Sequence, residues 1–378
     1  MRILTITSGG QISNGALLAA IQSAHGLADR GHEVSFLSPP NSFADKHVDR
    51  GRVQVINGNL NRWPLDELTR TRDWIEQNSI DIVHTHCSRA NAFGVLLRRI
   101  YGIPVVATAH ANKIQLHWCL NDHVVAVSDA TRRFHIRRNL VPPWKISTLL
   151  NPIDTHRFHP ISESERTAMR ESLGLSQDSV LLSIVGNVIP RKGHIDAVRA
   201  VAKIASHVPT VRLAIIGRAS EEDRRPLEHE ASRLGVAENV LWLGHRDDAA
   251  VLMAATDILL CPSLDEPFGL VAPEALACEV PVIATAVGGF LTTIQDGETG
   301  YLVRPRSPGE IADAALQLVR NPSLRRCFGR RGRNWVMENL SPNAHFSALE
   351  ATLHAVINKS LHRRKPKART SFHPEKVA

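Results

Sequence analysis

Two glutamates in the C-terminal half of this 378-residue chain stand where a bound ligand would meet them. Glu266 and Glu274 follow the apolar run 258–261, in a loop that leads through Gly269 and Leu270 into an expected helix. Open parallel sheets bind ligands at the carboxyl ends of their strands, and amides at a helix start attract phosphate oxygens. Carboxylates beside such a phosphate would accept hydrogen bonds from the hydroxyls of a ribose or a hexose. Taken alone, each glutamate is better explained as a solvated acid of a loop or a helix.

The histidines point to no single role by themselves. His110 follows the run 104–107, but the chain has 19 histidines, and a lone one is more often packed or hydrogen-bonded than catalytic. His84 and His86 alternate at the end of an expected strand, so that one of them would point inward. Because no third ligand is near them, we interpret both as structural or acceptor-side residues rather than as metal ligands.

Short β-branched runs alternate with amphipathic helical stretches in both halves of the chain, which is typical of parallel sheets with helices on both faces. The runs are apolar throughout, as strands buried between two helical layers are. In the first half the expected strands are 2–7, 33–37, 53–56, 80–84, 104–107 and 123–127. In the second half they are 180–185, 212–216, 240–243, 258–261, 281–285 and a short edge strand, 300–303. The sequence therefore predicts an α/β protein with two such sheets.

A hinge is expected at 151–162, where two prolines and polar residues interrupt the periodicity. We predict an N-terminal domain over 1–155 and a C-terminal domain over 156–340. A helix over 341–360 is expected to pack back toward the N-terminal domain. The basic tail 361–378 has too few apolar residues to fold alone and is predicted to be disordered.

Charge and cysteine content exclude several other classes of protein. Residues 359–378 carry +6 of the formal charge of +8, and a body of only +2 argues against nucleic acid as a partner. The five cysteines are scattered and never spaced as CxxC, which argues against a disulfide framework or a zinc knuckle and favours the cytoplasm. No stretch reads as a signal peptide, and none approaches the roughly 20 apolar residues that span a bilayer.

Several segments resemble, in order, the blocks of one known family. The spacing of Glu266 and Glu274 is similar to the E-x7-E signature of retaining GT-B glycosyltransferases, glycosyltransferase family 4. The turn at 185–194, with its Arg-Lys-Gly sequence after an expected strand, resembles the family's phosphate turn. Further family blocks are matched by residues 81–86, 104–110, 151–154 and 297–300. The resemblance spans roughly residues 1 to 336.

This resemblance implies a GT-B fold, in which two Rossmann-like domains with parallel sheets face each other across a cleft. It also implies transfer of a sugar from a nucleotide-sugar to an acceptor hydroxyl, with the anomeric configuration kept. Among the possible donors, a UDP-sugar is favoured over a GDP- or ADP-sugar. The implied catalytic residues are His110 on the donor sugar, Glu266 on its hydroxyls and Lys192 on its diphosphate. Other implied donor-binding residues are Arg191, Asn187, Phe268, Gly269, Leu270 and, on the ribose, Glu274. The implied acceptor-side residues are Gly10, Gly15 and His86.

Neither a cofactor nor a metal is expected. The chain lacks a D-x-D motif, and a lysine with a helix dipole can screen a diphosphate without Mg²⁺. The leaving phosphate can accept the acceptor's proton, so no protein base is required. One departure from the family matters: Asn187 stands where an arginine is common, which removes a charge that Arg191 or Arg218 would have to replace.

The acceptor is expected, from the resemblance alone, to be a glycan or a lipid-linked molecule in bacterial lipopolysaccharide or exopolysaccharide assembly. The basic stretch 132–138 and the basic tail would suit an anionic membrane surface, which predicts a cytoplasmic protein that is peripheral on the inner face of the cell membrane. For both segments a solvated surface is the alternative. Two further functions stay open: a catalytically weak sugar-nucleotide-binding protein, motivated by Asn187, and a nucleotide-sugar 2-epimerase.

Overall fold

The computed structural model describes residues 1–11, 14–60 and 65–364, with side chains as far as residue 362. This part of the chain packs into two compact units. The first unit comprises Met1–Thr108, His117–Val124 and the chain from Ser347 on, and the second comprises Ala109–Leu116 and Val125–Phe346. The division differs from a single cut at residue 155, because two segments of the N-terminal half pack with the second unit.

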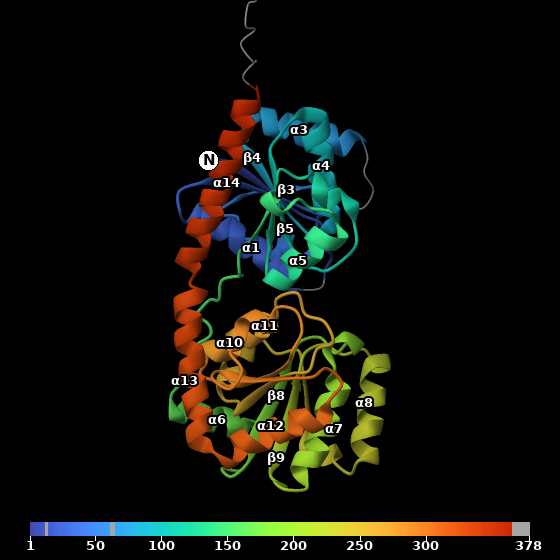
Figure 1. Cartoon of the computed structure of the whole chain (residues 1–378), viewed down its shortest axis with the longest axis vertical. Coiled ribbons are helices and arrows are strands. Elements are labelled where there is room, and N and C mark those ends of the chain that lie inside the picture. The colour runs from blue at the N-terminus through green and yellow to red at the C-terminus, as the bar shows by residue number, and fades with distance from the viewer. Residues whose placement is uncertain (12–13, 61–64, 365–378) are drawn as a thin grey trace, which may run out of the picture. The chain divides into compact units, whose positions relative to one another are not determined.

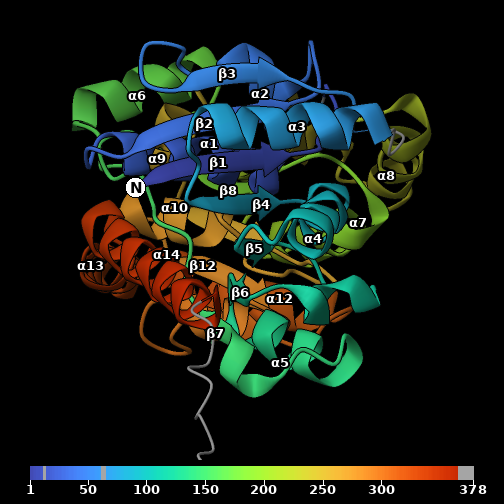
Figure 2. The same cartoon turned by 90° about the horizontal axis from the view of Figure 1, so that it is seen from above.

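Seven strands form the first sheet, in the order β3-β2-β1-β4-β5-β6-β7 (Figure 2). Their bounds are β1 Arg2–Thr7, β2 Glu33–Ser38, β3 Gln54–Asn57, β4 Ile82–His86, β5 Val105–Ala109, β6 His123–Ala126 and β7 Ile146–Thr148. Neighbouring strands from β3 to β5 pair in parallel. The first six match predicted strands within two residues, and β7 is the one that the sequence pattern missed.

Helices α1 (Gly15–Ala28), α2 (Phe43–His47), α3 (Leu65–Gln77) and α4 (Ser88–Tyr101) belong to the first unit (Figure 1). Helix α1 starts at the Asn14 side chain, which accepts a hydrogen bond from the Leu17 amide, and it packs on β1 and β2. Helix α4 packs on β1 and β4 and ends at Gly102, whose φ of 72° lies in the left-handed region. Every residue of β4 is buried, as expected for a central strand covered on both faces.

Helix α14 (Pro342–Arg364) extends four residues beyond the predicted end at 360. Leu361, His362 and the two arginines that follow are compatible with a helix, and the first breaker is Pro366. Within the first unit, Glu350 of α14 accepts hydrogen bonds from Arg30 at 2.8 Å and contacts His32 Nε2 at 3.1 Å. The rest of the predicted tail, 365–378, lies outside the described residues.

The second sheet has six strands in the order β10-β9-β8-β11-β12-β13, and the predicted edge strand is at its edge. The bounds are β8 Val180–Val185, β9 Val211–Ile216, β10 Val240–Gly244, β11 Ile258–Cys261, β12 Val282–Thr285 and β13 Gly300–Val303. Paired strands run parallel throughout. Both sheets together confirm the predicted α/β fold with two Rossmann-like parallel sheets.

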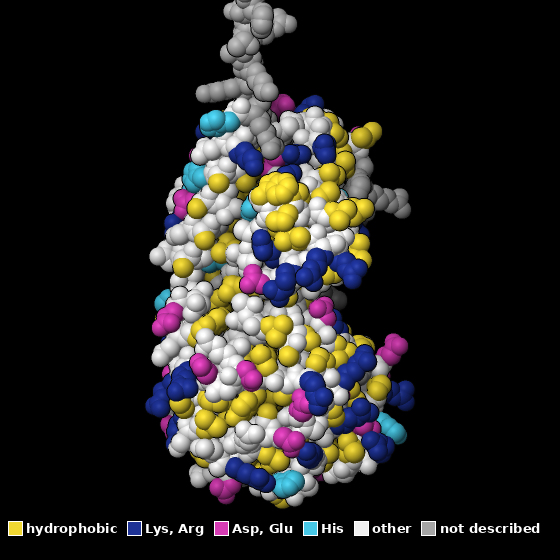
Figure 3. Space-filling model, in the orientation of Figure 1, with side chains coloured by type: hydrophobic (Ala, Val, Ile, Leu, Met, Phe, Trp, Pro, Cys, Tyr) yellow, Lys and Arg dark blue, Asp and Glu magenta, His cyan; other side chains and the backbone are white. Residues whose placement is uncertain are grey.

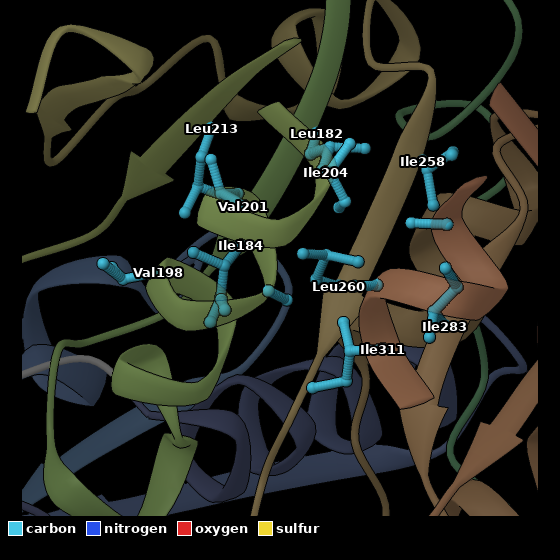
Figure 4. Close-up of a cluster of buried hydrophobic side chains, with 14 of the residues drawn as sticks. Leu182, Ile184, Val198, Val201, Ile204, Leu213, Ile258, Leu260, Ile283 and Ile311 are labelled. Atoms are coloured by element: carbon cyan, nitrogen blue, oxygen red, sulfur yellow. The ribbon is translucent and has the colours of Figure 1, made fainter. Parts of the chain in front are cut away.

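The helices of the second unit are α5 Asp129–Arg138, α6 Glu163–Ser172, α7 His194–Ala205, α8 Glu221–Arg233, α9 Ala249–Ala254, α10 Val271–Ala277, α11 Phe290–Thr293, α12 Pro308–Arg320 and α13 Pro322–Asn339. Helix α7 places Val201 and Ile204 in one buried cluster with Leu182, Ile184 and Leu260 of the sheet (Figure 4). Burial of such apolar side chains is the main force that holds a helix on a sheet.

A buried ion-pair cluster fixes the start of β11, the strand that leads to Glu266. Asp257 accepts hydrogen bonds from Arg166 at 2.8 Å, from Arg170 at 3.1 Å and from the Leu181 amide at 2.8 Å. Because both arginines lie on α6, the cluster joins this helix to two central strands. The loop that follows β11 therefore begins from a firmly held strand.

Candidate donor site of the second unit

Glu266 and Lys192 meet at the carboxyl ends of β8 and β11. The Lys192 Nζ lies 2.5 Å from Glu266 Oε2, and Arg191 Nη1 lies 3.5 Å from the same oxygen. Arg191 also donates to the carbonyl of Asp265. Glu266 is 7% exposed, so its carboxylate is buried but paired. Three residues predicted separately from the turn and from the loop thus form one charged cluster.

Glycines let the loops around Glu266 interlock at backbone distance. Gly288 has a φ of 53°, and a Cβ there would lie 1.9 Å from the Glu266 carbonyl oxygen. The Gly289 amide donates to that same oxygen at 2.8 Å. A Cβ on Gly193 would lie 2.0 Å from the carbonyl oxygen of Pro262. These approaches require glycine, and they fix the position of the Glu266 backbone.

The turn after β8 is built in the same way. Gly186 and Gly217 have φ values of 136° and 152°, and a Cβ on Gly217 would lie 2.0 Å from the Gly186 carbonyl oxygen. The Val188 amide donates to the Arg218 carbonyl oxygen at 2.8 Å. Asn187 stands exposed on this turn. The turn is therefore open to solvent at the position where the family commonly carries an arginine.

His194, which opens α7 beside Lys192, is a site residue that the sequence reasoning did not single out. Its side chain is buried, and neither ring nitrogen has a hydrogen-bond partner. Burial and the charge of Lys192 lower its pKa to about 4. The imidazole is thus neutral near pH 7, and Lys192 carries the positive charge here.

Glu274 lies on α10, and its side chain is largely but not fully buried. Burial raises its pKa to about 7, against the opposing charges of Arg157 and Lys192. Arg157 was not predicted as a site residue; its amide donates at 3.1 Å to Asp154, in the expected hinge. Only the fold brings this hinge residue near Glu274, so no local signal in the sequence could have assigned it.

Phe268, Gly269 and Leu270 form the predicted entry to α10. Phe268 is buried, and Gly269 has a φ of 82° with room for no Cβ, because one would lie 2.3 Å from the ring of Phe290. Leu270 is the N-cap residue, and no side chain caps the helix. The Ala272 amide donates to the Gly269 carbonyl oxygen at 3.0 Å, and no side chain competes for the amides that precede it.

His110 belongs to the second unit, as Lys192 and Glu266 do. Its pKa is lowered by burial to about 4, which makes the ring neutral near pH 7. The segment that carries it is tied to α5, since His135 Nε2 lies 3.2 Å from the Ala111 carbonyl oxygen. Helix α5 is tied in turn to the loop of Glu266, because Ser128 Oγ donates to the carbonyl of Pro267 at 2.6 Å.

The predicted acceptor-side residues lie in the first unit. Gly10 accepts a backbone hydrogen bond from Phe43 at 2.9 Å, and Gly15 is the first residue of α1. Residues 12 and 13 between them lie outside the described residues. His86 is 1% exposed, its ring lies 4.3 Å from that of His84, and both are buried on β4. Their acceptor role stays a prediction.

Neither a metal site nor a membrane span is found in the part of the chain that the structure describes. No group of three or more histidine, cysteine, aspartate or glutamate side chains there is arranged to hold a metal ion. Over the same residues, no helix combines the length and the apolar character needed to cross a bilayer.

Comparison with known proteins decides the family. Residues 14–157 match the model of "Glycosyltransferase Family 4", and residues 165–335 match that of "Glycosyl transferases group 1". The chain is 30% identical to N-acetyl-alpha-D-glucosaminyl L-malate synthase of Bacillus anthracis, over 88% of this chain and 91% of that protein. The chain belongs to glycosyltransferase family 4. A second relative, D-inositol 3-phosphate glycosyltransferase of Mycobacterium bovis, is 31% identical over 83% of this chain and 72% of that protein.

Comparison with solved structures shows that the fold is GT-B. The structure of Anabaena Alr3699/HepE in complex with UDP superposes with a TM-score of 0.84 at 21% identity, covering 94% of this chain and all of that one. WaaG, a glycosyltransferase involved in lipopolysaccharide biosynthesis, superposes with a TM-score of 0.69 at 18% identity, covering 91% of this chain and 99% of that one. The predicted family and fold are therefore confirmed.

Proposed function

We propose that this family 4 enzyme is a retaining glycosyltransferase that moves a sugar from a UDP-sugar to an acceptor hydroxyl. The observation that carries the proposal is the contact between Lys192 and Glu266, with Glu274 and Arg157 in the same unit. One cation for a diphosphate and two carboxylates for hydroxyls are the groups that a nucleotide-sugar needs. UDP is favoured over GDP and ADP because the structural relative cited above binds UDP.

In this proposal, Lys192 leaves the Glu266 carboxylate when a donor arrives and turns to the diphosphate. Glu266 is then released to accept hydrogen bonds from the hydroxyls of the sugar, and Glu274 from those of the ribose. The neutral imidazole of His110 is suited to contact the sugar as a hydrogen-bonding group without adding charge. Arg191, the backbone at Gly269 and Leu270, and the exposed Asn187 would bind the rest of the donor.

The reaction breaks the bond between the anomeric carbon and the diphosphate oxygen and forms one to the acceptor oxygen on the same face. Negative charge grows on the leaving diphosphate, where a fixed cation such as Lys192 lowers the barrier most. The acceptor's proton passes to that phosphate, so the proposal needs neither a protein base nor a metal ion. Retention and metal independence are both parts of the proposal.

The proposed setting is bacterial cell-surface glycan assembly, with a glycan or lipid-linked acceptor. WaaG, which is involved in lipopolysaccharide biosynthesis, is a relative that supports this setting. A cytoplasmic location with peripheral attachment to the membrane through residues 132–138 and the tail stays a prediction. Liposome co-sedimentation that weakens with salt would support it, and binding that ignores anionic lipid would contradict it.

Proton NMR of early product tests the proposal directly. The enzyme is incubated with candidate UDP-, GDP- and ADP-sugars and an acceptor panel, with EDTA or with Mg²⁺. We expect an α-linked first product from an α-linked UDP-sugar, at the same rate in EDTA. An inverted product or a strict need for Mg²⁺ would contradict the mechanism. Donor binding without transfer or hydrolysis would favour the catalytically weak sugar-nucleotide-binding protein. Inversion of the donor sugar at C2 would favour the nucleotide-sugar 2-epimerase.

A further inference from the structure

A hollow of about 340 Å³ lies in the second unit beside the loop of Glu266. Its polar and aromatic lining comes from three segments. Helix α5 contributes Arg133, Phe134, Arg137 and Arg138, the segment after β5 contributes Asn112, and the loop after β11 contributes Asp265. Asp265 directly precedes Glu266 in the chain, so the hollow opens next to the proposed sugar position. We call these six residues the arginine groove.

The three arginines of the groove have no charge partner among the described residues. All three are exposed, and none of their side chains makes an ion pair or a hydrogen bond with the described residues. Their neighbour Arg132 differs, because its Nε donates to the carbonyl of Ile146 at 3.3 Å. The one acidic residue of the same helix, Asp129, accepts a hydrogen bond from the Thr148 hydroxyl at 2.6 Å. Lysine and arginine side chains gather over α5 on the surface in Figure 3.

Helix α5 is held rigidly enough to present these side chains as a site. Ser128 Oγ and Thr131 Oγ1 lie 2.6 Å and 3.4 Å from the carbonyl oxygen of Pro267. On the buried face, Asn139 donates to the carbonyl of Lys113 at 2.9 Å. The face that is left for a ligand carries Arg133 and Arg137, which are four residues apart and therefore adjacent on the helix.

We propose that the arginine groove binds an oxyanion of the acceptor, a phosphate or a carboxylate carried by a sugar-like, hydroxyl-bearing part of it. The inference rests on the proposed function and names its acceptor class. Planar guanidinium groups match the geometry of such an oxyanion and bind it with two hydrogen bonds each. Asn112 and Asp265 supply partners for hydroxyls, and the Phe134 ring offers an apolar wall, so the groove fits an anionic polyol.

The membrane contact predicted for residues 132–138 would use the same arginines differently, so the two uses are rivals. The groove is a hollow with a carboxylate in its wall, whereas a lipid surface favours a continuous basic face free of acids. Because a phosphate can belong either to a soluble acceptor or to a lipid headgroup, the experiment must separate the two sources.

The test titrates inorganic phosphate by calorimetry into the full chain saturated with the nucleoside diphosphate that it binds best. Saturation fills the donor site, so that added phosphate meets only other sites. The proteins compared are the wild type, Arg133→Ala, Arg137→Ala and the control Arg331→Ala, an exposed arginine of α13 away from the groove. We expect saturable binding to the wild type and the control, and binding about tenfold or more weaker in each groove variant.

Transfer assays supply a second readout, in which each phosphorylated monosaccharide is compared with its neutral parent. The wild type should prefer the phosphorylated acceptor, and Arg133→Ala should lose this preference through KM rather than kcat. Phosphate binding that is absent from the wild type, or equal in all four proteins, would overturn the proposal. Vesicles of phosphatidylglycerol that bind through Arg133 while inorganic phosphate does not would also overturn it.

Nucleotide affinity separates a failure of the groove from a failure of the proposed function. All four proteins should bind the nucleotide within about twofold of one another, because exposed arginines outside the donor site act on it only through screened charge. If no nucleotide binds to any of them, the proposed function fails. The same comparison of variants, made with the nucleotide-free proteins, then still decides whether the groove binds phosphate.

Discussion

The two parallel sheets of this protein end in turns of very different kinds. At the carboxyl ends of β8, β11 and β12 the turns touch backbone to backbone, and a Cβ on Gly288 would lie 1.9 Å from a carbonyl oxygen. In the turn after β1, a Cβ on Gly9 would lie 2.1 Å from the Leu17 side chain rather than from any backbone atom, and a Cβ on Gly10 would meet nothing within 4 Å. The loops that follow the strands of the second sheet also hold a charged pair, Lys192 and Glu266. In the first sheet, the last three residues of β4 include two buried histidines, His84 and His86.

Under the proposed function, this difference means that backbone geometry fixes the donor side and leaves the acceptor side to side chains. A nucleotide diphosphate is the same in every donor of one class, so a rigid, glycine-built site serves it. Acceptors vary, and a position with open space around it, such as Gly10, tolerates substitution. The following predictions test this contrast, in order of decreasing effect.

Lys192→Ala should have the largest effect on activity. The fixed charge on the leaving diphosphate is lost, and we expect kcat/KM to fall about 100- to 1000-fold. Lys203→Ala, which removes an exposed lysine paired with Asp313 on the outside of the same unit, is the matched control and should stay near wild type. Steady-state transfer rates measure both. Equal activity of the wild type, Lys192→Ala and Lys203→Ala would show that Lys192 does not contribute to catalysis.

Gly288→Ala and Gly10→Ala compare the two sheets directly. The first change forces a methyl group onto the Glu266 carbonyl, and we expect a loss of about 2 to 4 kcal/mol in the free energy of unfolding. The second should cost less than about 0.5 kcal/mol, because Gly10 has free space around it. Gly297→Ala, with a φ of 74° but nothing within 4 Å, isolates the conformational cost, about 1 kcal/mol. Urea unfolding measures all three, and equal losses would refute the contrast.

Glu274 makes the stability of the empty protein depend on pH. Its pKa is about 7 in the folded protein against 4.5 in the unfolded chain, so between these values the folded state holds a proton that the unfolded chain has released. Stability contributed by this group is therefore present below about pH 4.5, falls as the pH rises toward 7 and stays lost above it. Glu274→Gln should remove this loss, which amounts to about 1 to 3 kcal/mol.

The measurement is the free energy of unfolding of the wild type and Glu274→Gln at pH 4.5 and pH 8. The variant should gain stability relative to the wild type at the higher pH only. A difference that is constant between the two pH values would contradict burial as the cause of the raised pKa.

Asn187→Arg should have the smallest effect. The side chain is exposed on the phosphate turn, so an arginine there fits and adds a charge-assisted hydrogen bond to a diphosphate. We expect UDP to bind about two- to tenfold more tightly, as measured by calorimetry. Unchanged affinity would show that Arg191 or Arg218 already supplies the charge.

Features of the fold and of the candidate site could be predicted from the sequence where they depend on local patterns, and not where they depend on contacts between distant residues. Within the described residues, the sequence predicted twelve of the thirteen strands and the family, and it assigned the turn 185–194 and the glutamate loop to the same donor, because local patterns and motifs encode them. It did not predict β7, which has only three residues, or the approach of Arg157 to Glu274. Nor did it show that α5 packs against Pro267, since that contact joins residues 139 positions apart. Long-range contacts of this kind leave no local trace.

A thermal-shift panel of UDP, GDP, ADP and their common sugars tests the central claim most directly, that the second unit holds a nucleotide-sugar donor through Lys192 and Glu274. The wild type and Lys203→Ala should be stabilised by one nucleotide class, UDP in our proposal, and Lys192→Ala and Glu274→Ala should lose most of that shift. No shift with any nucleotide, or the same shift in all four proteins, would contradict the account.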